Sequence, residues 1–416
     1  MIISLASLLQ ATSYAHWLRF YRKNHILNLL QMNRSLKFVL FIAFSIGQIA
    51  ISQEPIDLSI DSSNVSTPFY SGLNGYFSYR IPTLIQSKKA LVAFAEGRKN
   101  STSDFGNIDL VYRRSANKGK TWEPIQILID KDTIAAQNPV PIYVKEKNKI
   151  VLLFNITSQS EHDILNNDYD PKDERKAYVT YSYDDGQSWS IPKDITKDVK
   201  LPHWRWHAIG PVHGIELIYG NQKGRLVAPV AMSVDKGQKA YCMALIYSDD
   251  QGEHWKIGAI DNDLTDTVQS NETTIVELTN GHIYVNTRDH LGGSLEKNRG
   301  ETYSLDGGLT FTKPIIESDK FPSPIVQSSL LRWDSSLDGK HNMIFFATPS
   351  NPSKRENLVL MASNDETKHW KPLYKIHNGF SAYSDMVKLN KKTLGIIYET
   401  NDYKKIKFKR VKIKRP

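Results

Sequence analysis

Residues 182–189 read SYDDGQSW, and this pattern of a serine, an aspartate, a glycine, a hydroxyl residue and a tryptophan recurs along the chain. Similar segments begin at Ser115, Ser248 and Ser304, and a more divergent one begins at Ser363. The steps from each serine to the next are 67, 66, 56 and 59 residues. Such regular self-similarity indicates one supersecondary unit that is repeated around the fold.

Each segment has the chemistry of a tight turn between two strands. An aspartate side chain accepts hydrogen bonds from backbone N–H groups that follow it, and glycine supplies the positive φ that a tight turn needs. Three segments depart from the pattern, with Asn117 for the aspartate, His254 for the hydroxyl residue and Phe311 for the tryptophan. Because these changes fall in outer turns, we expect them to have little effect on a functional site.

The segments between the turns have the composition of short β-strands. Residues 149–154, 176–181 and 282–286 are rich in β-branched and aromatic side chains, and no stretch shows a sustained helical period. With residues 1–52 set aside, the remaining 364 residues hold six units of about 60 residues. We therefore predict an all-β fold, a six-bladed β-propeller with four-stranded antiparallel blades, that occupies residues 53–416 as one domain.

Residues 1–52 have the features of a targeting segment. Residues 32–37 are basic, residues 38–47 are apolar, and small side chains near Ser52 offer a cleavage site, as in a secretory signal peptide. A membrane anchor is the alternative, but about 10 apolar residues are too few for a bilayer, which takes about 20. We expect residues 1–31 to be an over-extended start. The mature protein would be secreted or periplasmic and would have no stable membrane anchor.

The formal net charge of +9 comes from the two ends of the chain. Residues 1–52 contain five Lys or Arg and no acid, and residues 404–416 contain eight, which leaves a net charge of −4 between them. A basic tail can bind nucleic acid or membranes, but apolar residues such as Ile406 and Phe408 alternate with the lysines here. That alternation is typical of a closing strand with one solvated face. We therefore predict no nucleic-acid partner, and an anionic ligand would have to be held by particular arginines.

Cysteine and histidine usage excludes two further classes of site. Cys242 is the single cysteine, so no internal disulfide is possible, and its apolar neighbours predict a buried core residue. No cluster of His or Cys has metal-ligand spacing, and no glycine-rich phosphate loop is present. We therefore expect neither a metal nor another cofactor.

Several segments between the turns resemble the exo-α-sialidases, or neuraminidases, of the Asp-box (BNR-repeat) superfamily. They run in the family's order from about residue 70 to the end, and the ordered set is far more specific than the turn pattern. The matching segments are 79–82 (YRIP), 96–98 (EGR), 103–104 (SD), 210–215 (GPVHGI), 271–278 (NETTIVEL), Arg288, Arg355, 382–385 (AYSD) and 397–399 (IYE). Val212 stands where many relatives have glycine, so the resemblance is a weaker guide to substrate preference.

The resemblance implies a role for five residues in binding. Arg80, Arg288 and Arg355 would grip the carboxylate of sialic acid, because a planar guanidinium matches a carboxylate with two parallel hydrogen bonds. Arg98 would contact a hydroxyl of the sugar ring. Glu399 would hold Arg80 in place through a buried ion pair.

The resemblance also implies three catalytic residues. Tyr383 would be the nucleophile and Glu272 its base, since a sialoside carries a carboxylate on its anomeric carbon and would repel an attacking carboxylate more than a phenol. Asp104 would protonate the departing sugar oxygen and later activate water. That role requires a carboxyl that is protonated near the working pH.

Three other acids are alternatives. Asp109 is five residues from Asp104 but begins a strand, whereas Asp104 lies in a Ser/Thr-rich loop. Glu277 lies on the opposite face of its strand from Glu272, because strand side chains alternate. Glu161 is a weaker candidate for contacting the glycerol or N-acetyl side of the ligand.

The sequence thus predicts an exo-α-sialidase that hydrolyses terminal α-linked sialic acid from glycoproteins, glycolipids and oligosaccharides. Hydrolysis would retain the anomeric configuration through a covalent tyrosyl intermediate, and the partners would be sialylated glycans. Two alternatives are a trans-sialidase with an aromatic acceptor platform and a non-catalytic sialoglycan-binding propeller. A deaminated sialic acid as the preferred substrate also stays open.

Overall fold

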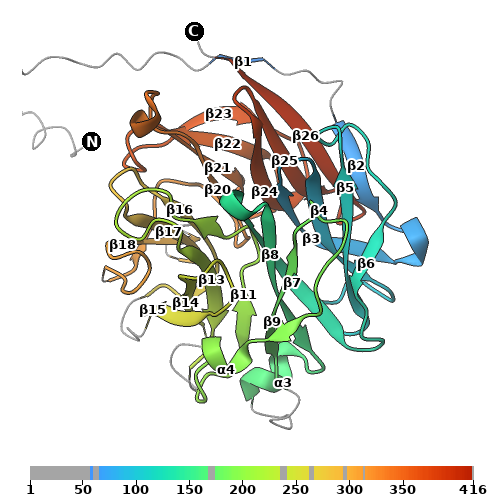
Figure 1. Ribbon diagram of the computed structural model, residues 1–416. Coiled ribbons are helices and arrows are strands. Elements are labelled where there is room, and N and C mark those ends of the chain that lie inside the picture. The colour runs from blue at the N-terminus through green and yellow to red at the C-terminus, as the bar shows by residue number, and fades with distance from the viewer. Residues whose placement is uncertain are drawn as a thin grey trace, which may run out of the picture. The chain divides into compact units, whose positions relative to one another are not determined.

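The computed structural model describes residues 57–59, 65–166, 174–234, 241–261, 267–293, 298–312 and 314–414. The predicted signal segment, residues 1–52, lies outside these ranges. Strands dominate (Figure 1), which confirms the all-β prediction. Within the described ranges the helical segments are short: η1 (Leu73–Gly75), η2 (Lys145–Lys147), α3 (Glu161–Asn166), α4 (Thr196–Val199) and η5 (Ser336–Asp338).

The first and longest sheet is antiparallel except at one point. Its eight strands are β3 (Ser78–Gln86), β4 (Leu91–Arg98), β5 (Ile108–Ser115), β6 (Gln126–Ile129), β7 (Ala135–Val144), β8 (Lys149–Thr157), β9 (Lys176–Ser182) and β10 (Lys193–Asp194).

Three sheets follow in chain order. The second contains β11 (His207–Ile209), β12 (Ile215–Glu216), β13 (Leu226–Met232), β14 (Cys242–Ser248) and β15 (Lys256–Ile260). The third contains β16 (Ser270–Glu277), β17 (Ile283–Asp289), β18 (Arg299–Ser304) and β19 (Ile316–Glu317). The fourth contains β20 (Ser329–Asp334), β21 (Met343–Pro349), β22 (Leu358–Ser363) and β23 (Lys371–Lys375).

The fifth sheet joins the two ends of the described chain. It contains β24 (Ser381–Asn390), β25 (Thr393–Thr400) and β26 (Lys405–Lys414), and both β1 (Asp57–Ser59) and β2 (Val65–Tyr70) pair with β26. Ile406 and Phe408 are completely buried, so the predicted closing strand is confirmed. Gly119 of the first turn packs so closely that a Cβ there would lie 2.1 Å from the Phe408 ring.

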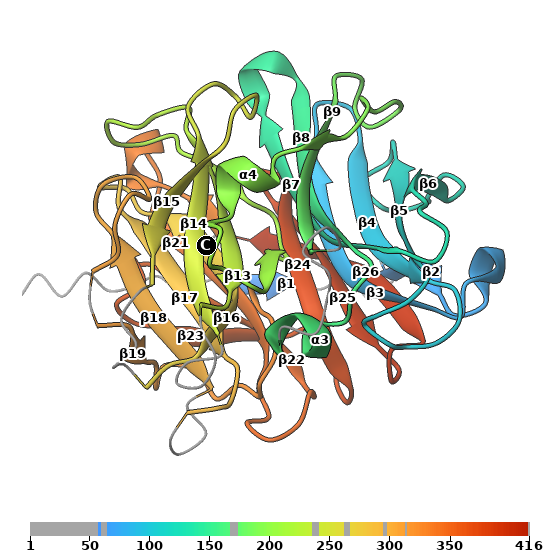
Figure 2. The ribbon, with the colours of Figure 1, turned by 90° about the horizontal axis from the view of Figure 1, so that it is seen from below.

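The sheets follow one another around a common axis in a β-propeller arrangement (Figure 2). Their innermost strands contact each other in a closed cycle, from β3 through β7, β12, β16, β20 and β24 back to β3. Within the described residues the strands form five sheets rather than six separate four-stranded ones. The reason is a parallel bridge between Ile108 of β5 and Ala135 of β7, which merges two antiparallel four-stranded runs into one eight-stranded sheet.

All five repeated segments form the predicted turns between the outer two strands of a four-stranded run. In the second copy, the Ser182 hydroxyl donates to Asp184 Oδ1 at 2.8 Å and accepts from the Gly186 N–H at 2.8 Å. The N–H of Ser188 donates to the same Asp184 Oδ1 at 2.9 Å. The other four copies make the same three hydrogen bonds, with Asn117 Oδ1 in place of an aspartate oxygen in the first.

The aromatic residue that ends each segment fills space between neighbouring sheet layers. The Trp189 ring lies 5.7 Å from Phe94 and 5.8 Å from Tyr112, which belong to β4 and β5 of the preceding run. Such aromatic contacts add to the free energy gained by burying apolar area. The core is therefore a series of layers between successive runs of strands, and Cys242 lies fully buried in one of them, as predicted.

Candidate active site

A cavity of about 580 Å³ opens where the inner strands meet, and its lining is mainly polar and charged. Seven of the eight predicted site residues line it: Arg80, Arg98, Asp104, Glu272, Arg288, Arg355 and Tyr383. The eighth, Glu399, is fully buried behind Arg80. Residues scattered over about 300 positions of the sequence are thus brought to one place.

Irregularities in the inner strands aim several of these side chains. β3 shifts its register directly after Arg80, β16 shifts around Glu272, and β24 shifts around Tyr383. Ile81, the residue after Arg80, has a φ of 57°, which is rare for a β-branched residue. A bulge bends a strand and redirects its side chains, and bulges are common beside active sites.

Tyr383 and Glu272 are in direct contact although 111 residues separate them in the sequence. The Tyr383 hydroxyl donates a hydrogen bond to Glu272 Oε1, and Arg288 Nη1 donates to Glu272 Oε2 at 2.7 Å. Burial, and then the charge of Glu272, raise the pKa of Tyr383 well above its ordinary value. The surroundings therefore favour the neutral phenol, and its hydroxyl points at the Glu272 carboxyl.

Three guanidinium groups surround this phenol. Arg288 Nη1 lies 3.4 Å from the Tyr383 hydroxyl, and the Cζ atoms of Arg80 and Arg355 lie 5.4 Å and 5.7 Å from the centre of its ring. An anion placed beside Tyr383 would lie near all three positive charges and be stabilised by each of them. The arrangement suits a carboxylate, which accepts two parallel hydrogen bonds from an arginine.

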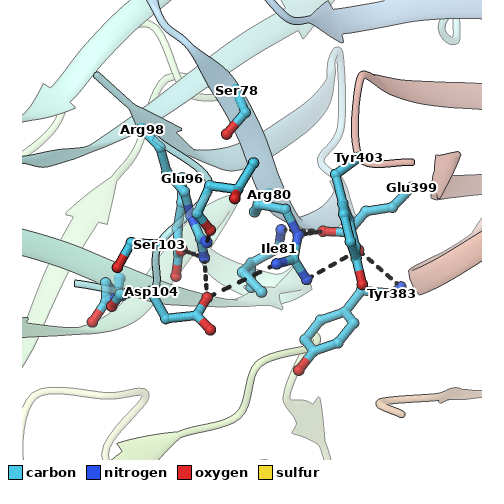
Figure 3. Close-up of polar contacts among 12 residues, drawn as sticks. Ser78, Arg80, Ile81, Glu96, Arg98, Ser103, Asp104, Tyr383, Glu399 and Tyr403 are labelled. Atoms are coloured by element: carbon cyan, nitrogen blue, oxygen red, sulfur yellow. Dashed lines mark hydrogen bonds and ion pairs between the residues drawn. The ribbon is translucent and has the colours of Figure 1, made fainter. Parts of the chain in front are cut away.

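The ion pair predicted between Glu399 and Arg80 is present (Figure 3). Arg80 Nε donates to Oε1 at 2.7 Å and Nη2 donates to Oε2 at 3.3 Å. The carboxylate also accepts the backbone N–H groups of Ile81 and Tyr383. Burial opposes the charge on Arg80, but Glu399 outweighs burial and raises the pKa of Arg80. One carboxylate on β25 therefore fixes both β3 and β24.

Asp104 lies on the loop between β4 and β5, and its side chain is 78% exposed. Arg98 Nη2 lies 2.6 Å from both Asp104 Oδ1 and Glu96 Oε2, and Arg80 Nη1 lies 3.9 Å from Asp104 Oδ1 (Figure 3). Loss of hydration acts to raise the pKa of Asp104, but Arg98 and then Arg80 outweigh it and lower the pKa. In this arrangement the two guanidinium groups favour the ionised carboxylate, whereas the predicted role needs the protonated carboxyl.

Of the three alternative acids, Glu161 lines the cavity and Asp109 and Glu277 do not. Asp109 is fully buried in β5, Glu277 accepts the backbone N–H groups of residues 218–219, and neither lines the cavity. Glu161, at the start of α3, does line it and accepts a hydrogen bond from the Tyr241 hydroxyl at 2.7 Å. Burial raises the pKa of Glu161.

Sequence reasoning missed one wall of the cavity, which includes Arg175, Trp206 and His290. Arg175 is 1% exposed, donates to Gln137 Oε1 at 2.7 Å, and lies 4.4 Å from the Trp206 ring. Burial lowers the pKa of Arg175 to about 10. Burial and then Arg288 lower the pKa of His290 to about 4. None of these residues lies in a repeated turn or in a segment shared with the family, so no sequence signal marked them.

Tyr403 was also not predicted, although it contacts two of the three arginines. Its hydroxyl accepts a hydrogen bond from Arg355 Nη1 at 3.0 Å, and its ring lies 4.0 Å from Arg80 Cζ (Figure 3). Arg355 Nη2 in turn donates to the Ile325 carbonyl at 3.0 Å.

Comparison with known proteins gives a consistent result. Residues 89–396 match the family model described as BNR repeat-like domain. The chain is 29% identical to an exo-alpha-sialidase of Aspergillus fumigatus, over 82% of this chain and 83% of the relative. It is 28% identical to a sialidase of Micromonospora viridifaciens over 79% of this chain, but over only 51% of that longer protein.

Solved structures agree on the fold. The Hadza microbial sialidase Hz136 superposes with a TM-score of 0.72 at 25% identity, over 84% of this chain and 68% of that one. An intramolecular trans-sialidase from Ruminococcus gnavus, at 17% identity, superposes with a TM-score of 0.68 over 84% of this chain and 99% of its own. The chain belongs to the family of BNR repeat-like domains and, within it, to the exo-α-sialidases, which are glycoside hydrolases.

Proposed function

We propose that this enzyme releases terminal α-linked sialic acid from glycoproteins, glycolipids and oligosaccharides with retention of configuration, through a covalent intermediate on Tyr383. The observation that supports this most is the hydrogen bond from the Tyr383 hydroxyl to Glu272, inside a ring of three arginines. The named activity of the relatives supports the substrate class.

Arg80, Arg288 and Arg355 bind the carboxylate of the sugar in this proposal. They come from β3, β17 and the loop before β22, so a substrate carboxylate is gripped from three directions and its orientation is fixed. Arg355 has no carboxylate of the described residues within ion-pair distance, so its charge is available to the ligand. Arg98 contacts a ring hydroxyl from the side of Asp104.

Tyr383 attacks the anomeric carbon while its proton passes to Glu272. The phenol is neutral before reaction, so it approaches a carbon that bears a carboxylate without charge repulsion. Arg288 binds both Glu272 and the phenol oxygen, so it stabilises the negative charge as it moves from one to the other. The bond to the departing sugar breaks as the tyrosyl bond forms.

Asp104 protonates the departing oxygen and then takes a proton from the water that cleaves the tyrosyl bond. Its two arginine partners hold its pKa down. A substrate carboxylate that binds Arg80 offsets part of this positive charge, so we propose that substrate binding raises the pKa of Asp104 toward the value a general acid needs. The exposed loop leaves its side chain free to turn toward the leaving group.

Replacing Tyr383 by Phe tests the proposal. We expect release of the aryl group from an aryl sialoside to fall by about 10³-fold or more, because the nucleophile is removed. A 3-fluorinated sialosyl fluoride should label the wild-type enzyme on the peptide that contains Tyr383. Tyr143→Phe, which alters a hydroxyl bonded to Asn148 near the end of β7 and outside the cavity lining, is the matched control and should retain full activity. Wild-type turnover by the Tyr383→Phe variant would overturn the mechanism.

Two product analyses separate this function from the alternatives. Added lactose captures the sialyl group if the enzyme is a trans-sialidase, whereas a hydrolase yields free sialic acid. A non-catalytic binding propeller would give neither product. NMR of the first product formed reports the anomeric configuration directly, and an inverted product would contradict the tyrosyl intermediate.

We propose further that the ring has six blades, with the eight-stranded sheet counted as two, β3–β6 and β7–β10. The closed cycle of six inner strands and the five repeated turns support this count. For residues 53–416 we propose export after cleavage near Ser52, which N-terminal sequencing of the protein from culture medium or periplasm tests. In the described ranges, no helix is long and apolar enough to cross a membrane.

A further inference from the structure

We propose that Tyr403 is a positioning residue that sets the spacing and orientation of Arg80 and Arg355, and so controls how strongly the site holds the substrate carboxylate. This inference rests on the proposed function, which makes those arginines the carboxylate site. It goes further because it assigns the geometry of the pair to a neutral side chain outside the cavity lining.

Tyr403 contacts the two arginines in two different ways. Its ring lies against the Arg80 guanidinium, 4.0 Å from Cζ, while its hydroxyl accepts from Arg355 Nη1 at 3.0 Å. Stacking on an aromatic face fixes the plane of a guanidinium, and a hydrogen bond fixes its rotation within that plane. One rigid side chain with two torsions therefore relates two arginines that lie 275 residues apart in the sequence.

The chemistry of the contact matters as much as its position. Glu399 already neutralises Arg80, because Arg80 Nε donates a hydrogen bond to Glu399 Oε1 at 2.7 Å. Arg355 is held by two neutral acceptors, the Tyr403 hydroxyl and the Ile325 carbonyl. A neutral acceptor orients a guanidinium but leaves its positive charge uncompensated, whereas a carboxylate would pair with it. The charge of Arg355 is thus reserved for the ligand.

The backbone around Tyr403 is strained in a way that supports this role. Residues 401, 402 and 403, in the turn between β25 and β26, have φ values of 54°, 50° and 64°. Asn and Asp tolerate the left-handed region, but a tyrosine there costs about 1 kcal/mol. Strain of this kind persists where the surrounding structure overrides it, and such sites are often functional.

The strained turn is fixed at several points. The Lys404 N–H donates to the Asn401 carbonyl at 3.0 Å, and the Ser71 N–H donates to the Lys404 carbonyl at 2.9 Å. The Phe380 ring lies edge-on to the Tyr403 ring at 4.7 Å. Tyr403 is therefore held between Phe380 and Arg80 and transmits a fixed geometry to both arginines.

The test separates the two contacts and isolates the carboxylate. Tyr403→Phe keeps the ring and removes the hydrogen bond, and Tyr403→Leu removes both. For each variant, inhibition constants are measured for free sialic acid and for its methyl ester, together with kcat, KM and the melting temperature. The matched control is Tyr374, which also stacks on a cation, Lys409 at 5.2 Å, and accepts a hydrogen bond from it at 2.9 Å, but lies outside the cavity.

We expect Tyr403→Phe to weaken binding of the free acid about tenfold, because it removes a hydrogen bond to a charged group. Tyr403→Leu should weaken it further, by about 30-fold or more, since the stacking is lost as well. Binding of the ester should change less than about twofold, because it presents no charge to the arginines. Tyr374→Phe and Tyr374→Leu should leave the ratio between acid and ester unchanged.

Two results would overturn the proposal. The first is an unchanged acid-to-ester ratio in both Tyr403 variants, whatever happens to the melting temperature. The second is a full tenfold effect of Tyr403→Phe in an Arg355→Lys background, where the bond to Arg355 is already altered. Because the readout is equilibrium binding, it stays informative even if the Tyr383→Phe experiment disproves the tyrosyl intermediate.

Discussion

The repeated turns and the cavity differ in how far apart in the sequence their hydrogen-bonded residues lie. In each turn the recurring hydrogen bonds join residues no more than four positions apart, such as the Gly186 N–H to the Ser182 hydroxyl. In the cavity, the bonds join residues 111 and 319 positions apart, from Tyr383 to Glu272 and from Arg80 to Glu399. A turn is therefore specified by its own eight residues, whereas the site is specified only by the assembled ring.

This difference explains why the turns vary and still work. His254 Nδ1 lies 2.6 Å from Asp250 Oδ2, the same distance that separates the Ser188 hydroxyl from Asp184 Oδ2. Thr367 occupies a glycine position of the fifth turn with a φ of 72° and still donates its N–H to Ser363. A local motif tolerates such replacements because its bonds need only a backbone N–H, as at Thr367, or a side chain with a matching donor, as at His254.

The largest expected effect comes from the cavity and concerns the base. Glu272→Gln should reduce kcat by about 10³-fold, because the amide cannot take the phenol proton. The variant also leaves the Arg288 charge without its carboxylate, so its urea midpoint should fall as well, and kcat is compared under conditions where circular dichroism shows the variant to be folded. Glu123→Gln, which alters an exposed ion pair with Arg114 in a turn, is the control and should leave both measurements unchanged. Retention of more than about a tenth of the activity by Glu272→Gln would contradict the role.

The next effect compares a remote contact with a local one. Glu399→Gln leaves the buried Arg80 charge uncompensated and should lower the free energy of unfolding by about 3 kcal/mol or more. Asp184→Ala removes hydrogen bonds confined to one exposed turn and should cost about 1–2 kcal/mol. Urea denaturation followed by tryptophan fluorescence measures both. Equal losses of unfolding free energy in the two variants would mean that the local turn bonds stabilise the ring as much as the buried Arg80–Glu399 pair does.

The smallest effect is a pH dependence of the turns. Burial acts to raise the pKa of the aspartate in each turn, but the hydrogen bonds that its carboxyl accepts within the turn outweigh burial. They lower the pKa of Asp250 to about 2. A carboxyl with a lowered pKa stabilises the fold above its ordinary pKa, and this contribution is lost as pH falls from about 4 to about 2. The side chains are partly exposed, so the contribution of each is modest.

Asn117 makes this prediction testable because it occupies an aspartate position and cannot titrate. Asn117→Asp should be nearly neutral in stability at pH 7 and should steepen the loss of stability in acid, whereas Asp250→Asn should flatten it. Urea titrations between about pH 5 and pH 2.5 measure the slope. Parallel slopes for both variants and wild type would show that the turns do not titrate as proposed.

Much of the fold could be predicted because its signals are local. The turns, the strands between them and the closing strand with buried Ile406 and Phe408 follow from patterns a few residues long. The number of separate sheets could not be predicted, because it depends on a single bridge between Ile108 and Ala135. Nothing in the repeat spacing distinguishes two adjacent blades from one merged sheet.

Only part of the site could be predicted, because some of its residues lie in recognisable local segments and others do not. Residues in segments shared with the family, such as Arg80 and Tyr383, could be predicted from the sequence, and the structure places them together. Arg175 and Tyr403 were missed because their importance comes from where the ring places them. The lowered pKa of Asp104 could not be predicted, because the sequence does not show that Arg98 turns toward Asp104 or that Arg80 of the neighbouring strand lies nearby.

The pairing of β2 with β26 means that the ring cannot close until the last strand has been synthesised. During translation β2 emerges early, and its edge stays unpaired until residues 405–414 are made. Tyr383 and Glu399 lie in the same last part of the chain, so the Arg80 guanidinium has no carboxylate from β25 until the ring can close. The nascent protein therefore acquires its two most interdependent features, an intact ring and a complete site, in one final step.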